Sequence, residues 1–84
     1  MNFQPWLEGQ ALGQMAGLPS EAPGALTRIM ARICADPYDR MLSVAVRADD
    51  PAVRMAELGD AGFIEFTIDE AAGLVRVHAL LWIG

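Results

Sequence analysis

Lysine is absent from this chain of 84 residues, and its six arginines are outnumbered by eleven acidic residues, so the formal net charge is −5. A protein that holds nucleic acid through phosphates uses several Lys or Arg side chains to displace counterions. A net-negative surface raises the electrostatic cost of that approach. Only Arg28 and Arg32, four residues apart, form a same-face basic pair, and a solvated helix face has the same pattern. The composition therefore argues against a broad nucleic-acid interface.

Cysteine occurs once, and long apolar runs do not occur. Cys34 alone can form neither an internal disulfide nor a cysteine-based metal cluster, so we expect a small packing residue. The sequence is 54% hydrophobic, yet no apolar run approaches the roughly 20 residues of a membrane-spanning helix. Residues 1–5 carry no basic flank or apolar signal core. We therefore expect a cytoplasmic protein with no membrane partner.

Signatures of metal or cofactor chemistry are also missing. The carboxylates at residues 36–39, 49–50 and 69–70 have no defined ligand spacing, and turn formation explains them. The loop at 59–62 lacks the length and the lysine of a phosphate-cradling loop. We expect no metal site and no small-molecule cofactor.

The length of 84 residues is enough for one domain and too short for two, so residues 1–84 are expected to form a single domain. A domain of this size buries only about 60 to 65% of the surface that its unfolded chain exposes. A partner that covers more apolar surface would stabilise it by mass action. Size alone therefore favours dependence on a partner.

The first half of the sequence predicts a short strand and two helices. Residues 2–4 are compatible with a strand, and Pro5 suits the first turn of a helix. Apolar residues at three- and four-residue spacing predict a helix over about residues 6–17. Ser20 is a candidate N-cap for a second helix, which Asp36-Pro37 ends. The short loop between the helices predicts an antiparallel two-helix hairpin.

The second half predicts a three-stranded antiparallel meander. Residues 52–58 are compatible with a strand, although their sequence also fits a helical turn. Alternation over residues 63–68 predicts a strand with one buried face, and the turn at 69–73 has the length that joins antiparallel neighbours. A final strand over 74–83 is apolar on both faces toward its end, as in a central strand or one covered by a partner. The expected fold class is α+β.

Motifs spread over nearly the whole chain resemble those of one protein family. ALGQMAGLP at residues 11–19 is similar to the end of that family's first helix, and ADPY at 35–38 is similar to the exit from its second. DDPAVR at 49–54 with GDAGFIEFTID at 59–69 resembles its strand–loop–strand, and VRVHALLWIG at 75–84 resembles its last strand. The family is the RelE/ParE-type toxins of bacterial type II toxin–antitoxin systems, and the likeness is to small actinobacterial-type members.

The resemblance implies a toxin that a cognate antitoxin neutralises by wrapping its surface. RelE-type members cut mRNA in the ribosome without a metal, through basic and aromatic side chains on the sheet, whereas ParE-type members poison DNA gyrase. The ribosome and mRNA are then candidate partners. Arg54 stands where the family often carries a catalytic basic residue. The alternative is an exposed arginine that pairs with Asp50, Glu57 or an antitoxin carboxylate.

Arg76, His78 and Trp82 form the most functional-looking group in the sequence. Arg76 and His78 lie two residues apart and therefore on one strand face. The histidine could act as an acid or base, and the arginine could hold a phosphate, so both are candidate catalytic residues. The alternative is a partly exposed face with a cross-strand pair between Arg76 and Glu65. Trp82 is expected to be a large buried aromatic that contacts the antitoxin.

Two functions follow from these residues. The first is the toxin component of a type II toxin–antitoxin module, which binds its antitoxin and could act as a ribosome-dependent mRNA endoribonuclease. The alternative is a catalytically degenerate, non-enzymatic interaction module that keeps the toxin fold. The acidic surface and the apolar end of the last strand, which could pair edge-to-edge with another chain, favour this alternative.

Overall fold

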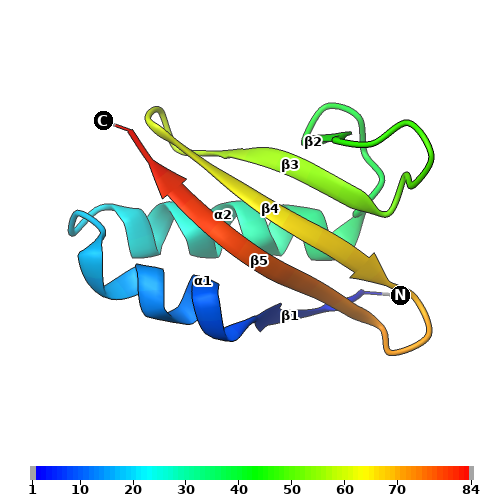
Figure 1. Ribbon diagram of the computed structural model, residues 1–84, viewed down its shortest axis with the longest axis horizontal. Helices are drawn as coiled ribbons and strands as arrows, with labels where there is room; N and C mark the ends of the chain where they lie inside the picture. The colour runs from blue at the N-terminus through cyan, green and yellow to red at the C-terminus, as the bar shows by residue number, and fades with distance from the viewer. Residues whose placement is uncertain (1, 84) are drawn as a thin grey trace.

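The computed structural model describes residues 2–83 and shows an α+β fold in which a twisted sheet packs against helices (Figure 1). The sheet has five strands in the order β1-β5-β4-β3-β2. The elements are β1 (Gln4–Leu7), α1 (Gly9–Gln14), a 3-10 turn η1 (Met15–Gly17), α2 (Ala22–Ala35), β2 (Ser43–Ala45), β3 (Val53–Leu58), β4 (Gly62–Asp69) and β5 (Leu74–Trp82). The predicted fold class is confirmed, with one strand more than expected.

Strands β3, β4 and β5 form the predicted antiparallel meander. The additional strand is β2, which pairs antiparallel with β3 at one edge of the sheet. At the other edge, β1 runs parallel to β5. The first and last strands of the chain are therefore neighbours, and this pairing closes the fold.

The first strand lies later in the sequence than predicted. Pro5, which was expected to begin a helix, lies inside β1 opposite Val75, and Trp6 lies opposite Arg76. An edge strand tolerates proline because one side of the strand needs no donor. Pairing with β5 thus holds these residues in an extended conformation, and α1 begins only at Gly9.

Helix α2 is the helix that the sequence predicted, although the expected cap is wrong. The residue at its N-cap is Glu21 rather than Ser20, and no side chain caps the helix. Asp36 is the C-cap, as the following proline requires. Arg28 and Arg32 are exposed as predicted. The buried face consists of Ala22, Ala25, Leu26, Met30, Ile33 and Cys34.

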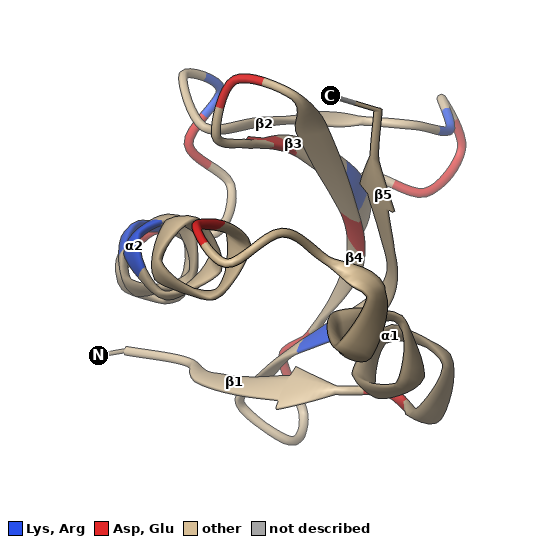
Figure 2. Cartoon of the chain, turned by 90° about the vertical axis from the view of Figure 1, so that its left-hand side faces the viewer, with Lys and Arg blue, Asp and Glu red and all other residues tan. Residues whose placement is uncertain are grey.

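The two helices run in opposite directions, as predicted, but they pack against different parts of the sheet (Figures 1 and 2). Helix α2 crosses one face and contacts β1, β3 and β5, whereas α1 lies against β5. There the Gln14 side-chain Oε1 accepts a hydrogen bond of 2.7 Å from the backbone N–H of Leu80. Beyond the end of β1, α1 thus caps a strand edge that would otherwise be unpaired. Neither helix in residues 2–83 is long and apolar enough to cross a membrane.

A β-bulge in β5 changes which residues face α2. Glu65 pairs with Ala79 but the next residue, Phe66, pairs with Val77, so His78 is the extra residue of the bulge. Before the bulge the buried residues are Val75 and Val77, and after it the buried residue is Leu80. Strict alternation, which would place Trp82 on the same face as Arg76 and His78, therefore does not hold beyond His78. We call the sheet face opposite α2 the open face, because no helix of residues 2–83 covers it.

Candidate functional site

The structure divides the four predicted site residues between the two faces of the sheet. Arg76 and His78 lie on the open face and are half-buried. Arg54 lies on the opposite face, with the buried Ala56 and Leu58. Trp82 also lies on that side. The open face therefore carries only two of the four residues.

Arg76 is held by two carboxylates. Its Nε donates to Asp69 Oδ2 at 3.0 Å, and its Nη1 donates to Glu8 Oε1 at 3.2 Å. Hydrogen bonds to Asp69 and Glu8 raise the pKa of Arg76 above its ordinary value. The pKa of Asp69 is lowered, first by the backbone N–H of Ala72 and then by Arg76. The positive charge of Arg76 is thus locally neutralised.

The alternative pair between Arg76 and Glu65 is wrong. Arg76 lies opposite Thr67, and the bulge places Glu65 opposite Ala79. The carboxylates that bind Arg76 come from the β4 end and from the residue before α1. Alternation placed Asp69 on this face, whereas no local signal in the sequence could have brought Glu8 there.

His78 shares a hydrogen bond between its Nε2 and the Thr67 hydroxyl, across the β4–β5 pair. The bulge presents this ring beside Arg76, and Trp6 lies opposite Arg76 on β1 and is 50% exposed. A histidine oriented by a hydroxyl can take up or give a proton. Thr67 was missed by the sequence analysis, although it alternates with Glu65 on the outward side of β4. His78, oriented by Thr67, is therefore the group of the open face suited to proton transfer.

Arg54 is a structural clamp in the interior. The residue is only 5% exposed, so the expected exposed arginine that pairs with Asp50 or Glu57 is wrong. Its Nε donates to Ser43 Oγ at 2.6 Å, its Nη2 to the Ser43 carbonyl at 2.9 Å, and its Nη1 to the Pro51 carbonyl at 3.1 Å. The guanidinium therefore fastens β2 and its following loop to β3. A catalytic role for Arg54 stays a prediction, and these contacts give no support to it.

Tyr38 links the Arg54 clamp to the turn before β5. The guanidinium carbon of Arg54 lies 5.7 Å from the centre of the Tyr38 ring, within the range of a cation–π contact. The Tyr38 hydroxyl donates to Glu70 Oε2 at 3.0 Å. Burial, followed by this bond to Glu70, raises the pKa of Tyr38 above its ordinary value. This group ties the end of α2 to two parts of the sheet.

Trp82 packs on the helix side, so its expected grouping with Arg76 and His78 is wrong. The bulge at His78 reverses the direction of the side chains that follow. The indole of Trp82 is half-buried against the core and lies over Gly59 and Gly62. With Ala25 it lines a hollow of about 400 Å³. Its predicted contact with an antitoxin remains a prediction.

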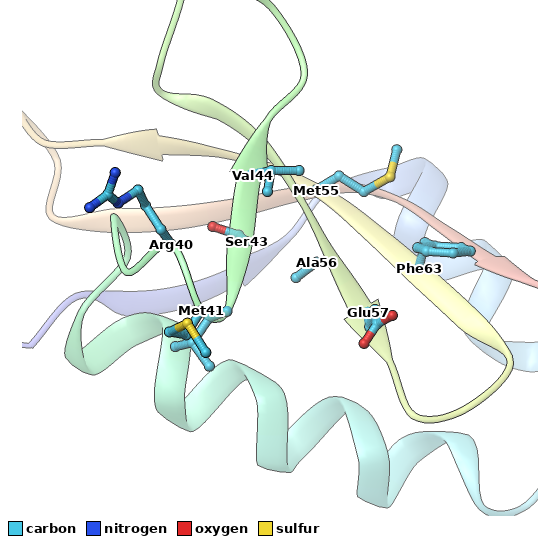
Figure 3. Close-up of a pocket in the computed structure, with 9 residues that line it drawn as sticks. Arg40, Met41, Ser43, Val44, Met55, Ala56, Glu57 and Phe63 are labelled. Atoms are coloured by element: carbon cyan, nitrogen blue, oxygen red, sulfur yellow. The ribbon is translucent and has the colours of Figure 1, made fainter.

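Two adjacent hollows lie near β3, the first at its edge beside β2 and the second on the open face. The first, of about 300 Å³, is shown in Figure 3. The second, of about 200 Å³, lies toward β5 and includes Glu65 in its wall. Met55 and Phe63 border both hollows. The first hollow is lined by Arg40, Met41, Leu42, Ser43, Val44, Met55, Ala56, Glu57 and Phe63.

Comparison with known proteins identifies the architecture. No family model and no curated protein matches the sequence. A free E. coli RelE toxin carrying two arginine-to-alanine mutations superposes with a TM-score of 0.82 at 14% identity, over 98% of this chain and 84% of that one. The chain has the RelE-type toxin fold. The predicted resemblance is thereby confirmed at the level of the fold.

Two complexes in the comparison extend the same result to other organisms. A chain of the RelBE2 toxin–antitoxin complex from Mycobacterium tuberculosis gives a TM-score of 0.81 at 13% identity, over 98% of this chain and 99% of that chain. The archaeal RelE–RelB complex from Pyrococcus horikoshii gives 0.75 at 15% identity, over 100% and 98%. The RelE-type fold thus accounts for essentially the full length of the sequence.

Proposed function

We propose that this chain is the toxin component of a cytoplasmic toxin–antitoxin pair and that its principal act is to bind a cognate antitoxin. The observation that carries the proposal is the RelE-type fold, which spans 98% of the chain at a TM-score of 0.81 to a protein solved in a toxin–antitoxin complex. The exposed apolar side chains of the open face agree with it. Leu81 is 56% exposed and Val44 is 60% exposed. A partner that covered them would add the burial that so small a domain lacks.

The arrangement of the arginines favours binding over phosphate chemistry. Arg54 is buried, and each of its three nitrogens donates a hydrogen bond to Ser43 or Pro51. Arg76 is neutralised by Glu8 and Asp69. A site that stabilises a phosphorane-like charge needs donors aimed at it and free to bind. This supports the non-enzymatic form of the proposal, an interaction module with a toxin's fold.

Ribosome-dependent cleavage of mRNA is the second candidate function. It is favoured by one observation, the hydrogen bond between His78 and Thr67 beside Arg76 on the open face. In that reaction His78 would exchange a proton with the ribose hydroxyl or the leaving oxygen, and Arg76 would leave its carboxylates to contact the phosphate. No metal is needed for either step.

Inducible expression in a bacterial host distinguishes the two functions. Growth arrest with transcript cleavage, relieved by His78→Ala but not by the exposed-loop control Arg47→Ala, would support the nuclease. Binding of a small protein encoded by an adjacent gene of the native host, without arrest, would support the interaction module. Failure of the purified chain to bind any protein encoded by an adjacent gene would overturn the antitoxin proposal.

A further inference from the structure

We propose that the open face around Met55, Phe63, Leu81 and Glu65 docks a basic, apolar segment of the partner protein. The segment would place two apolar side chains in the two adjacent hollows and a Lys or Arg against Glu65. The inference rests on the proposed function, because it takes the antitoxin as the partner. It adds where that partner sits and which chemistry it must carry.

The apolar part of this surface is continuous. The hollows of about 300 Å³ and 200 Å³ share Met55 and Phe63 as a common wall. Leu81 closes the second hollow, and Met41, at the edge of the first, is 90% exposed. Methionine adapts its shape to a partner at low cost. Large exposed apolar side chains gathered in this way are typical of a protein interaction site.

Glu65 supplies the chemistry that selects the partner. It is half-buried in the wall of the apolar second hollow and makes no ion pair within residues 2–83. A carboxylate in such a setting gains most from a cation that arrives with the partner. Glu57 adds negative charge at the first hollow. It also lines a different hollow with Arg28 and Arg32, whose positive charges lie on its other side. Glu65 is therefore the carboxylate that we assign to the pairing.

The same charges disfavour two other occupants. In a symmetric dimer of this chain, the same patch would face itself and bring like carboxylates together. The cations near it are Arg76, already bound by Glu8 and Asp69, and Arg40 at the far rim. RNA phosphates would meet the same repulsion. A basic protein segment is the occupant whose charge matches.

The test uses the full chain and the partner that the binding experiment of the proposed function identifies, with affinity measured by calorimetry. We expect Glu65→Lys to weaken binding on the order of 30-fold, as for the loss of a close interfacial charge pair. Leu81→Asp should weaken it similarly. The charge-matched control Asp49→Lys, in an exposed loop, should bind within about twofold of wild type. Glu65→Gln, which keeps the side-chain shape and removes the charge, should also weaken binding. This variant tests the charge even if the lysine variant fails to fold.

A charge swap provides the decisive result. Each Lys and Arg of the partner is replaced by Glu in turn, and one of these variants should restore binding to Glu65→Lys. Wild-type affinity in Glu65→Lys, Glu65→Gln and Leu81→Asp would overturn the docking face and leave the antitoxin proposal standing. No binding by the wild-type chain would overturn both. A dimer of the chain alone that Leu81→Asp dissociates would overturn the assignment of the partner.

Discussion

The indole of Trp82 lies over Gly62, and a Cβ on this glycine would come within 2.8 Å of both Trp82 Cε3 and the Leu81 carbonyl oxygen. Gly62 begins β4 directly opposite Trp82 in β5. The backbone oxygen cannot move aside without breaking the strand pair. A glycine is therefore required where the β3–β4 hairpin meets the last strand.

The substitution Gly62→Ala should lower the free energy of unfolding by about 1 to 3 kcal/mol, the usual cost of overpacking. Chemical denaturation of the purified chain measures it. Gly13→Ala is a suitable control, because Gly13 lies in α1 with nothing within 4 Å of its Cβ position. That change should be stabilising by up to about 1 kcal/mol through helix propensity. Equal stability of Gly62→Ala and wild type would contradict the close contact.

Trp82→Ala should also destabilise the fold, because the indole packs against the core from the helix side. The ring is only half-buried, so we expect a loss of about 2 to 3 kcal/mol, below the 3 to 5 of a fully buried aromatic. Thermal melting with and without the partner separates two roles. A variant that stays folded but binds the partner more weakly would support the predicted antitoxin contact. An unchanged melting temperature would show that the packing contributes nothing.

Arg54→Lys tests the clamp between β2 and β3. Lysine cannot reproduce the forked bonds to the Ser43 and Pro51 carbonyls. Leaving these acceptors unpaired should cost about 2 to 3 kcal/mol in the free energy of unfolding. Arg47→Lys, at an exposed ion pair, should change stability by less than about 0.5 kcal/mol. Stability equal to wild type with loss of RNA cleavage would instead support a catalytic Arg54.

The acid sensitivity of the fold should depend on Asp69. Its pKa is lowered in the folded chain by the Ala72 N–H and by Arg76. A lowered folded-state pKa contributes stability above the unfolded value, near pH 4, and this contribution is lost as pH falls through the folded value. Asp69→Asn should therefore be less stable at pH 7 and should lose less stability below pH 4. Asp60→Asn, which changes a turn carboxylate outside any ion pair of residues 2–83, should follow the wild-type curve.

Local patterns in the sequence predicted the elements whose buried face depends only on their own residues. The stripe of α2 and the alternation of Ile64, Phe66 and Ile68 in β4 depend only on residues within one element. The position of β1 could not be predicted in this way, because its residues pair with β5 from the other end of the chain. Pro5 fits a helix start equally well when that pairing is unknown. Non-local contacts thus account for the misplaced strand.

The candidate site was predicted only in part, because local spacing places some of its residues and an irregularity in strand pairing places the others. Arg76 and His78 share a face as their spacing predicted, although His78 is the extra residue of the bulge, and the bulge reverses Trp82. A bulge of this kind has no signal in the sequence of β5. The burial of Arg54 did have one, since it alternates with Ala56 and Leu58 in β3. Neither interpretation of Arg54, as the family's catalytic residue or as an exposed arginine, used that alternation.

The bulge at His78 also determines which changes of sequence β5 can accept. Its extra residue lets one strand present polar side chains outward in its first half and an apolar side chain, Leu81, outward in its second half. Closing the bulge with His78 retained would shift the register of the residues after it by one, bury Leu81 in place of Leu80 and turn Trp82 toward solvent. Point substitutions on the open face leave this arrangement intact. The strand should therefore tolerate changes of residue type on the open face, so that a new binding partner can be accommodated without a new fold.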